Sequence, residues 1–507
     1  MDIKPNIVTS LFTRTTSMAS IFPGLRRAAP KLPRDFFICQ RCLRHSTSIL
    51  SKVRAPGKPN LSRSTRFNSS TATLEALAKQ KSPLSDLSQT IYSSQKKDLL
   101  KKRFWPETSS NAAGYWLLAS AGSVFGIVVF GGLTRLTESG YAKSITEWRP
   151  VTGSLPPLSQ ADWDSEFSKY RASPEYKLLN PHMTLAEFKK IYYMEWGHRL
   201  WGRFVGLSFV LPAVYFVSRR RISAPMALRL LSISFLIAGQ GALGWYMVKS
   251  GLKDDLFAPG SHPRVSQYRL TAHLGTAFVC YTAMLWNGLS ILRTNAILSH
   301  TTHPQSATRV YNQLKHLLSP TLSPFRKSVA GLAILVFSTA LSGGLVAGLD
   351  AGMIYNEFPR MGSRFYPPKS ELLDPFYSRK EDQRDLLWRN MLENPSTVQL
   401  DHRVLATTTF TAVLALWGYS RFGKSVKQAL PTAAKRGMAA VLGLVCMQAA
   451  LGISTLIYLV PVPLAAAHQA GSLALLTGVL VLGNRVWVPR ALMKVVEKRV
   501  AGAGKGK

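Results

Sequence analysis

The stretch Met-Glu-Trp-Gly-His-Arg-Leu-Trp-Gly-Arg, residues 194–203, places an acid and a histidine three residues apart at the edge of an apolar segment. From Leu200 to Val217 the chain is apolar apart from Arg203 and Ser208. Ionisable groups beside a hydrocarbon layer are costly and therefore indicate function. Three more histidines stand at the same kind of position, so the pattern predicts a ligand that imidazoles bind in pairs. The four are His198, His273, His402 and His468.

The composition indicates a membrane protein. The 507 residues are 46% hydrophobic and yet carry a net charge of +37, because apolar and basic residues occupy different stretches. Eight apolar stretches, of roughly 18 to 24 residues each, are long enough to cross a hydrocarbon layer of ~30 Å as helices. The fourth and seventh are the weakest. We therefore predict an all-α polytopic membrane protein with spans near 113–134, 199–218, 227–248, 269–292, 328–348, 403–420, 437–460 and 465–484.

Residues 1–70 differ in kind from the rest. They hold 13 Lys or Arg against two acids, many Ser and Thr, and no apolar run long enough to span. This is typical of a mitochondrial transit peptide followed by a disordered basic segment. A basic tail that binds nucleic acid is the alternative, and the eight spans that follow disfavour it. Cys39 and Cys42 form a Cys-x-x-Cys pair, but the other cysteines, Cys280 and Cys446, lie in spans, so no metal site is predicted there.

The charges of the connections predict the orientation. The connections 219–226, 293–327 and 421–436 carry three, five and five basic residues and no acid. The connections 135–197 and 349–400 are mixed, with eight basic and eight acidic residues in the first and seven and eight in the second. The positive-inside rule then places both termini in the mitochondrial matrix and all four histidines towards the intermembrane space.

The chain contains a repeat of about 200 residues. Gly131-Gly132-Leu133 matches Gly343-Gly344-Leu345, the run 240–244 matches 448–452, and His198-Arg199 matches His402-Arg403. Each half has four spans, so we predict two tandem pseudo-symmetric four-helix bundles in the same orientation. The predicted divisions are 1–70, the matrix-side linker 71–112, the bundle 113–292, the linker 293–327, the bundle 328–484 and the basic tail 485–507.

The histidines of each half open its second and fourth spans and lie at one depth, which is the arrangement for bis-axial ligation of a heme iron. A lone interfacial histidine is more often a hydrogen-bonding group, but four at symmetric positions favour ligands. Arg199 and Arg403 are either interface anchors or partners of heme propionates. The neighbouring aromatic residues form an interfacial belt or line a porphyrin; they are Tyr192, Tyr193, Trp196 and Trp201.

The halves differ at one position. Glu195, three residues before His198, is matched by Gln399 in the second half. Residues three apart share a helix face, so Glu195 is predicted to lie over the pocket of His198, where a carboxylate could accept protons from a substrate or position water. Its alternative roles are an ion pair with Arg199 or a helix cap. The asymmetry suggests a reactive site in the first half and an electron-carrying site in the second.

Six motifs in order resemble the heme A synthase family over residues 110–485. They are Gly-Gly-Leu-Thr-Arg-Leu-Thr-Glu-Ser-Gly (131–140), Glu-Trp-Gly-His-Arg (195–199), Gln-Gly-Ala-Leu-Gly-Trp-Tyr-Met-Val (240–248), Gly-Leu-Asp-Ala-Gly (348–352), Gln-Leu-Asp-His-Arg (399–403) and Ala-His-Gln-Ala (467–470). The resemblance implies a mitochondrial inner-membrane oxidoreductase that converts the C8 methyl of heme O to a formyl group, through hydroxymethyl and gem-diol stages. The product, heme A, serves cytochrome c oxidase.

On this resemblance, His198 and His273 would hold the substrate heme O, His402 and His468 the iron of a cofactor heme b, and Glu195 would match the essential acid. Mitochondrial ferredoxin and its reductase would be electron partners, with heme O synthase and cytochrome oxidase assembly factors as further candidates; a homo-oligomer is compatible with the sequence. Many bacterial relatives have a cysteine pair in an outer loop, but 135–197 and 349–400 contain no Cys, so a thiol role is not expected there.

The sequence is compatible with two other classes of protein. A non-catalytic bis-heme b electron carrier would use the four histidines equally, but such carriers place hemes on both sides of the membrane. A heme transporter or assembly factor without chemistry leaves Glu195 without a role. The long connections 135–197 and 349–400 are expected to hold short helices over the outer surface, and their Pro-Pro pairs, 156–157 and 367–368, fall in matching places.

Overall fold

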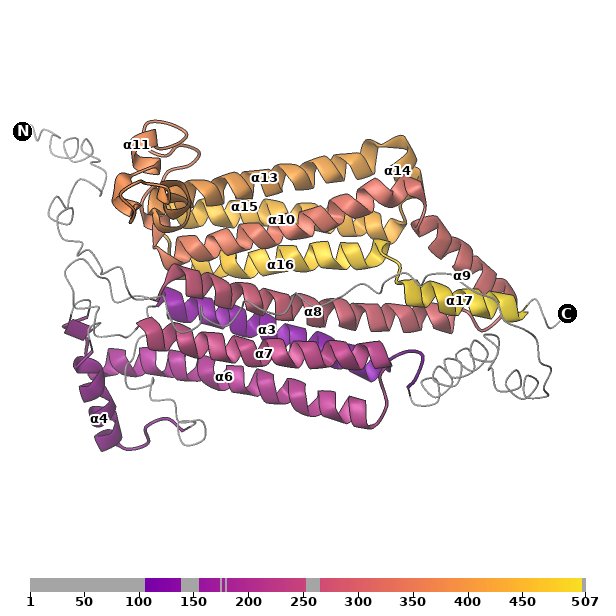
Figure 1. Cartoon of the computed structure of the whole chain (residues 1–507), viewed down its shortest axis with the longest axis horizontal. Helices are drawn as coiled ribbons and strands as arrows, with labels where there is room; N and C mark the ends of the chain where they lie inside the picture. The colour runs from indigo at the N-terminus through magenta and orange to yellow at the C-terminus, as the bar shows by residue number, and fades with distance from the viewer. Residues whose placement is uncertain (1–104, 138–154, 174–175, 178–179, 252–264, 504–507) are drawn as a thin grey trace, which may run out of the picture. The chain divides into compact units, whose positions relative to one another are not determined.

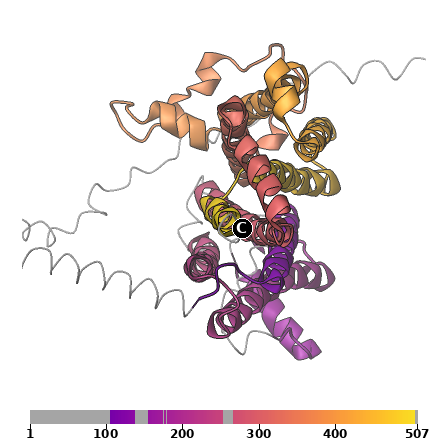
Figure 2. The ribbon, with the colours of Figure 1, turned by 90° about the vertical axis from the view of Figure 1, so that its right-hand side faces the viewer.

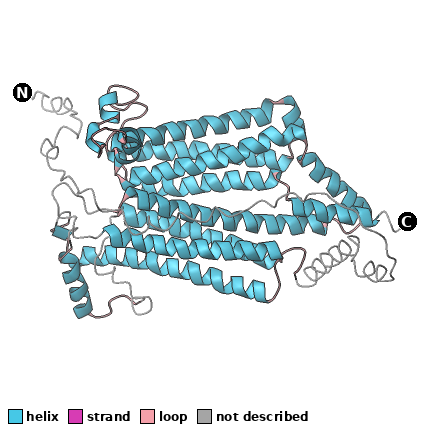
Figure 3. Ribbon diagram, viewed as in Figure 1, coloured by secondary structure: helices cyan, strands magenta, loops and turns pink. Residues whose placement is uncertain are grey.

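The computed structural model describes residues 105–137, 155–173, 176–177, 180–251 and 265–503. Within these ranges the ordered elements are helices, apart from one isolated bridge between Met361 and Arg364 (Figure 3). The predicted transit segment 1–70, nearly all of the linker 71–112, and residues 138–140 of the first motif lie outside the described residues.

Eight of the described helices have 25 residues or more (Figure 1). Seven of the predicted spans lie wholly inside them. The prediction for the seventh span, 437–460, runs three residues too far, because Leu459 and Val460 have positive φ angles of 60° and 56° and precede Pro461. The long helices are α3 (Asn111–Leu136), α6 (Leu185–Ser218), α7 (Ala224–Gly251), α8 (Gln267–Ser299), α10 (Ser323–Gly348), α13 (Pro395–Phe422), α15 (Thr432–Ile457) and α16 (Val462–Val486).

By length and composition, seven helical segments of the described chain could cross a membrane. Both α8 and α15, which contain the spans expected to be weakest, are among them. The predicted span that is not among the seven lies in α13. This helix has 28 residues but carries Asp401, Arg403 and several threonines in its first half. These polar residues lower its mean hydropathy although its length would suffice.

Helix α6 begins earlier than predicted. It starts at Leu185, so His198 and Glu195 lie well inside the helix and not at its opening. The reason is a capping box, in which the Thr184 side chain accepts from the Glu187 backbone and the Glu187 carboxylate accepts from the Thr184 N–H. Glu195 is therefore not a cap.

The long helices contact each other in two matching rings (Figure 2). In the first half α3 contacts α6, α6 contacts α7, α7 contacts α8, and α8 returns to α3. The second half repeats this order with α10, α13, α15 and α16. The halves meet through their first and fourth helices, because α8 contacts α10 and α16, and α3 contacts α16.

Glycines of the repeat permit these contacts between halves. A Cβ at Gly132 of α3 would lie 1.5 Å from Oε1 of Gln469 on α16, whose Nε2 donates to the Val128 carbonyl at 2.9 Å. At the matching Gly344 of α10, a Cβ would lie 3.2 Å from Leu274 of α8. These glycines therefore allow a close approach of helices that joins the two halves.

An ion pair also crosses between the halves. Arg135, at the end of α3, donates to the Asp350 carboxylate at 3.0 Å and to the Ala347 carbonyl at 3.0 Å. Asp350 follows α10 and has a left-handed backbone, with φ of 50°.

The long connections contain short helices, as expected; their placement over an outer surface stays a prediction. Helix α4 (Gln160–Arg171) contacts α6, where Trp163 and Tyr170 pack with Phe188 and Tyr192. The second connection holds η7 (Ala351–Met353), α11 (Lys369–Leu372), η8 (Pro375–Tyr377) and α12 (Leu386–Glu393).

Asp385, just before α12, is 2% exposed and anchors the second connection. Burial alone would raise the pKa of this carboxyl, but hydrogen bonds from Ser378, the Arg389 side chain and the Arg379 N–H hold its pKa well below the ordinary value.

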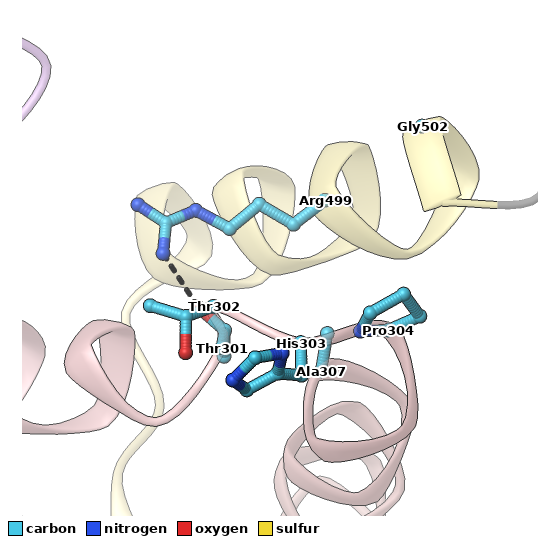
Figure 4. A pocket seen from close by; sticks show the side chains of 7 residues that line it. All are labelled: Thr301, Thr302, His303, Pro304, Ala307, Arg499 and Gly502. Atoms are coloured by element: carbon cyan, nitrogen blue, oxygen red, sulfur yellow. Dashed lines mark hydrogen bonds between the residues drawn. The ribbon is translucent and has the colours of Figure 1, made fainter. Parts of the chain in front are cut away.

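At the other end of the long helices, α9 (Pro304–Leu317) contacts α17 (Arg490–Ala503). Arg499 of α17 donates to the Thr301 hydroxyl at 2.6 Å (Figure 4). It also donates to the Leu298 carbonyl at 2.8 Å. Arg499 and Thr301 border a cavity of about 560 Å³.

Candidate functional site

The four predicted histidines lie on the second and fourth long helices of each half. His198 is on α6, His273 on α8, His402 on α13 and His468 on α16. His273, His402 and His468 stand six or seven residues after the start of their helices, whereas His198 stands 13 after Leu185. The four histidines therefore lie on matching helices of the two halves, and α6 differs by its longer N-terminal extension.

Each imidazole packs against a glycine of the preceding long helix. In the first half, a Cβ at Gly131 would lie 2.7 Å from Cε1 of His198, and a Cβ at Gly244 would lie 2.8 Å from Cε1 of His273. In the second half, a Cβ at Gly343 would lie 3.1 Å from Cε1 of His402, and a Cβ at Gly452 would lie 2.7 Å from Cε1 of His468. Carbon atoms in contact normally stand about 3.5–4.0 Å apart, so no other residue fits at these positions without moving the ring. Four glycines therefore set how close each ring can lie to the neighbouring helix.

The hydrogen bonds of His402 define its tautomer. The Ser342 hydroxyl lies 2.7 Å from Nδ1 of His402 and donates its single proton to the Thr339 carbonyl at 2.7 Å. The Ser342 oxygen must then accept from Nδ1–H, which leaves a lone pair on Nε2. Neutral imidazole in this state can bind a metal ion through Nε2.

The other three histidines are not held by such bonds. Nδ1 of His198, His273 and His468 is buried and has no hydrogen-bond partner among the described residues. The alternative that these are ordinary hydrogen-bonding histidines is therefore not favoured.

The two rings of the second half lie close together. The His402 and His468 centroids are 6.4 Å apart with an interplanar angle of 89°. Two metal–imidazole bonds of about 2 Å, with each ring centre roughly 1 Å behind its nitrogen, would separate the centres by about 6 Å. The spacing of the second pair fits two axial ligands of one iron.

Two glutamines support the histidine helices. Gln240 donates through Nε2 to the His273 carbonyl at 2.9 Å, and Gln448 donates likewise to the His468 carbonyl at 2.8 Å. The sequence repeat contained both glutamines, but their role was not predicted. Their recurrence at matching places was the available signal.

Glu195 and Gln399 have different partners. Glu195 is 4% exposed and forms an ion pair with Arg199, one helical turn away. Gln399 is 3% exposed and donates to the Tyr355 carbonyl at 2.9 Å. The ion pair considered from the sequence is thus present in the first half, and the second half has no carboxylate at the matching position.

The matching arginine of the second half also binds backbone. Arg403 donates to the Tyr355 carbonyl at 3.0 Å and to the Arg360 carbonyl at 3.1 Å. The guanidinium groups of both predicted propionate partners, Arg199 and Arg403, therefore contact protein groups in this structure.

The aromatic residues near His198 pack against protein. Trp201 donates to Ser123 at 3.0 Å and lies where a Cβ at Gly126 would be 2.7 Å from its ring. Phe130 stacks on the His198 ring with centroids 6.3 Å apart. Phe130 was not singled out from the sequence, and it precedes Gly131 in the first motif.

The remaining candidate sites are metal-binding clusters, cysteines and cavities. Among the described residues, no group of three or more His, Cys, Asp or Glu is placed to bind a metal ion. Cys280 and Cys446 are free thiols, and Cys39 and Cys42 lie outside the described residues. Neither the 560 Å³ cavity nor a second one of about 590 Å³ is lined by the four histidines.

Comparison with known proteins agrees with these motifs. The family model COX15-CtaA, described as cytochrome oxidase assembly protein, matches residues 114–480. The chain is similar to heme A synthase COX15 of Saccharomyces cerevisiae, with 52% identity over 77% of this chain and 78% of the yeast protein. It is 46% identical to heme A synthase COX15 of Homo sapiens, over 75% of this chain and 84% of the human one.

A third relative, from Schizosaccharomyces pombe, is named heme A synthase-mitochondrial ferredoxin fusion protein. It is 48% identical over 76% of this chain and 62% of its own length. The family match covers well over half of the chain, and these relatives are similar across most of it. The chain therefore belongs to the COX15-CtaA family of cytochrome oxidase assembly proteins.

Proposed function

We propose that this protein is a heme A synthase, an oxidoreductase that converts the C8 methyl of heme O to a formyl group and so supplies heme A for cytochrome c oxidase. The names of its relatives support this proposal, and so does a difference between the two halves of the structure. Two symmetric histidine pairs are each backed by glycines, but a buried carboxylate accompanies only one pair.

In this proposal the second half holds a cofactor heme b through His402 and His468. The 6.4 Å between their rings and the lone pair left on Nε2 of His402 fit that role. When bound, heme b would supply one-electron transfer. The protein contributes rigid ligands, because Gly343 and Gly452 fix the ring positions and Ser342 orients His402.

The first half holds heme O, the substrate, through His198 and His273. Oxidation of the methyl to an aldehyde replaces two C–H bonds by a C=O bond and removes four electrons and four protons when water supplies the oxygen. Two successive hydroxylations give a gem-diol, which loses water to leave the formyl group. Glu195 is the candidate acceptor for these protons.

Arg199 supports Glu195 in this role. Its guanidinium pairs with the carboxylate one turn away and so supplies the buried group with a counter-charge. That Arg199 and Arg403 bind propionates stays a prediction, and a propionate would have to replace the partners described above.

The proposal includes the membrane arrangement. We infer eight spans in two four-helix bundles in the mitochondrial inner membrane, with both termini in the matrix and the histidines towards the intermembrane space. Helix α13 is the eighth span, because it contacts α10 and α15 as α6 contacts α3 and α7. The fused fission-yeast relative supports a ferredoxin as electron partner. Ferredoxin reductase, heme O synthase, assembly factors and a homo-oligomer stay predictions.

The rival function, a bis-heme electron carrier, is not favoured by the names of the relatives or by the difference between Glu195 and Gln399. Heme analysis separates the two functions. The full chain would be purified from cells that make heme O, its hemes extracted in acid and identified by chromatography and mass. Wild type should yield heme b with heme O, a hydroxylated intermediate or heme A.

The matched variants are Glu195→Gln and Gln399→Ala, which alter equivalent positions in the two halves. Glu195→Gln should retain heme O and lose heme A, whereas Gln399→Ala should still make heme A. Heme b alone, at two per chain in every variant, would refute the synthase and leave the carrier.

A further inference from the structure

The cavity of about 590 Å³ lies where α15 and α16 meet helices α3 and α8 of the other half. Its lining includes Arg436 and Arg485 near one end, and Phe125 and Tyr281 deeper in the helix layer. On α16 the nearest lining residue to His468 is Ala474, six residues away, which is about 9 Å along a helix. The cavity is thus separate from the histidine site.

The two arginines lie together at the end of the bundle where α15 begins and α16 ends. A Cβ at Gly437 would be 3.2 Å from Nη1 of Arg485, so this guanidinium lies against the turn that carries Arg436. Nη1 of Arg485 also donates to the Ala433 carbonyl at 2.7 Å. Both arginines are exposed, and neither forms an ion pair with an acid in the part of the chain that the structure describes. The end of the cavity is therefore positively charged.

The walls of the cavity are apolar and narrow. The furrow between α15 and α16 is lined by the small residues Gly437, Ala440, Ala474 and Gly478. The two helices are in close contact at Gly478, because a Cβ there would lie 2.8 Å from Leu444. From Arg436 to Leu444 the furrow follows α15 for eight residues, or about 12 Å. That length and lining suit a hydrocarbon chain.

The deep polar groups are already used. The Tyr281 and Thr477 hydroxyls are hydrogen-bonded to each other at 2.6 Å. A polar ligand would find no free partner from this pair, whereas an acyl chain needs none. The cavity therefore combines a cationic mouth with an apolar interior.

We propose that this cavity binds an anionic membrane phospholipid. Its phosphate contacts Arg436 and Arg485, and one acyl chain lies along Ala440 and Gly478. Arginine matches phosphate geometry, and basic pockets between membrane helices bind such headgroups. The inference does not depend on the reaction proposed above.

Lipid retention tests the proposal. The full chain would be purified in mild detergent, and phospholipid retained per chain would be measured by extraction and mass spectrometry, followed by add-back of cardiolipin or phosphatidylcholine. Wild type should prefer cardiolipin. Loss of both arginines, in Arg436→Gln with Arg485→Gln, should weaken cardiolipin binding about 30-fold, since each basic residue contributes roughly fivefold. Arg436→Gln alone removes no described hydrogen bond and should show about fivefold.

A matched control removes the same charge elsewhere. Arg219→Gln with Arg421→Gln alters exposed arginines that do not line the cavity and should leave binding unchanged. Ala440→Trp fills the furrow and should also weaken binding, because the acyl chain is blocked. Equal effects of the two arginine pairs, or equal retention of phosphatidylcholine, would overturn the proposal. Inorganic phosphate binding that depends on Arg436 and is unaffected by Ala440→Trp would assign the site to a free anion instead.

Discussion

Adding one methyl group opposite a histidine should release heme b. In Gly452→Ala the new Cβ would lie 2.7 Å from Cε1 of His468. Carbon atoms need about 3.5–4.0 Å, so the ring must retreat by roughly 0.8–1.3 Å. Metal–ligand distances tolerate only about 0.2 Å. We therefore expect heme b affinity to fall at least as far as for loss of a supporting group, about 10- to 100-fold.

The same helix supplies the control. A Cβ at Gly443 would meet nothing within 4 Å, so Gly443→Ala should keep full heme and gain helix stability of up to about 1 kcal/mol. Gly343→Ala should be intermediate, because its Cβ would stand 3.1 Å from His402 and requires a smaller shift. The measurement is heme b per purified chain, from its absorption spectrum in pyridine. Wild-type heme content and spectrum in Gly452→Ala would refute the argument that these glycines position the ligands.

Three further outcomes are expected. Ser342→Ala removes the acceptor for Nδ1–H of His402 and should weaken heme b binding about tenfold, measured by heme titration; unchanged affinity would show that the bond does not orient the ring. Gln448→Leu leaves the His468 carbonyl without its donor and should cost about 1 kcal/mol in thermal stability, with no change expected in an equivalent variant of an exposed glutamine. Asp385→Asn should destabilise the second long connection at pH 7. Because the folded-state pKa of Asp385 is depressed, wild type should lose this advantage as pH falls through that value, so limited proteolysis should separate the two proteins at pH 7 and not at very low pH.

The spans could be predicted from the sequence because length and apolar composition suffice to define them. The start of α6 could not, since residues before His198 mix charged and aromatic side chains and give no membrane signal. Only the capping box at Thr184 and Glu187 marked it. The stretch 403–420 was also predicted from its apolar residues, but helix α13 is not among the seven helical segments that could cross a membrane by length and composition.

The positions of the four histidines were predictable because the repeat placed them in register, and their role as ligands stays a prediction. The contacts that position them were not, because they depend on how neighbouring helices are rotated. The packing of Gly452 on His468, the bond from His402 to Ser342 and the donation from Gln448 all cross between helices. Sequence spacing, by contrast, was enough to bring Glu195 beside Arg199 on one helix.

The contact of Gln469 with Gly132 bears on how the protein is made. Its amide reaches from the last long helix into the first, where it donates to a carbonyl of α3. If the first half entered the membrane alone, the surface beside Gly132 would face lipid instead of Gln469. If the second half entered alone, the Gln469 amide would lack its hydrogen-bond acceptor, which costs free energy in hydrocarbon. Each half is thus expected to stabilise the other in the membrane. Two separately expressed fragments, divided within residues 293–327, should find each other in the membrane and be degraded when produced singly.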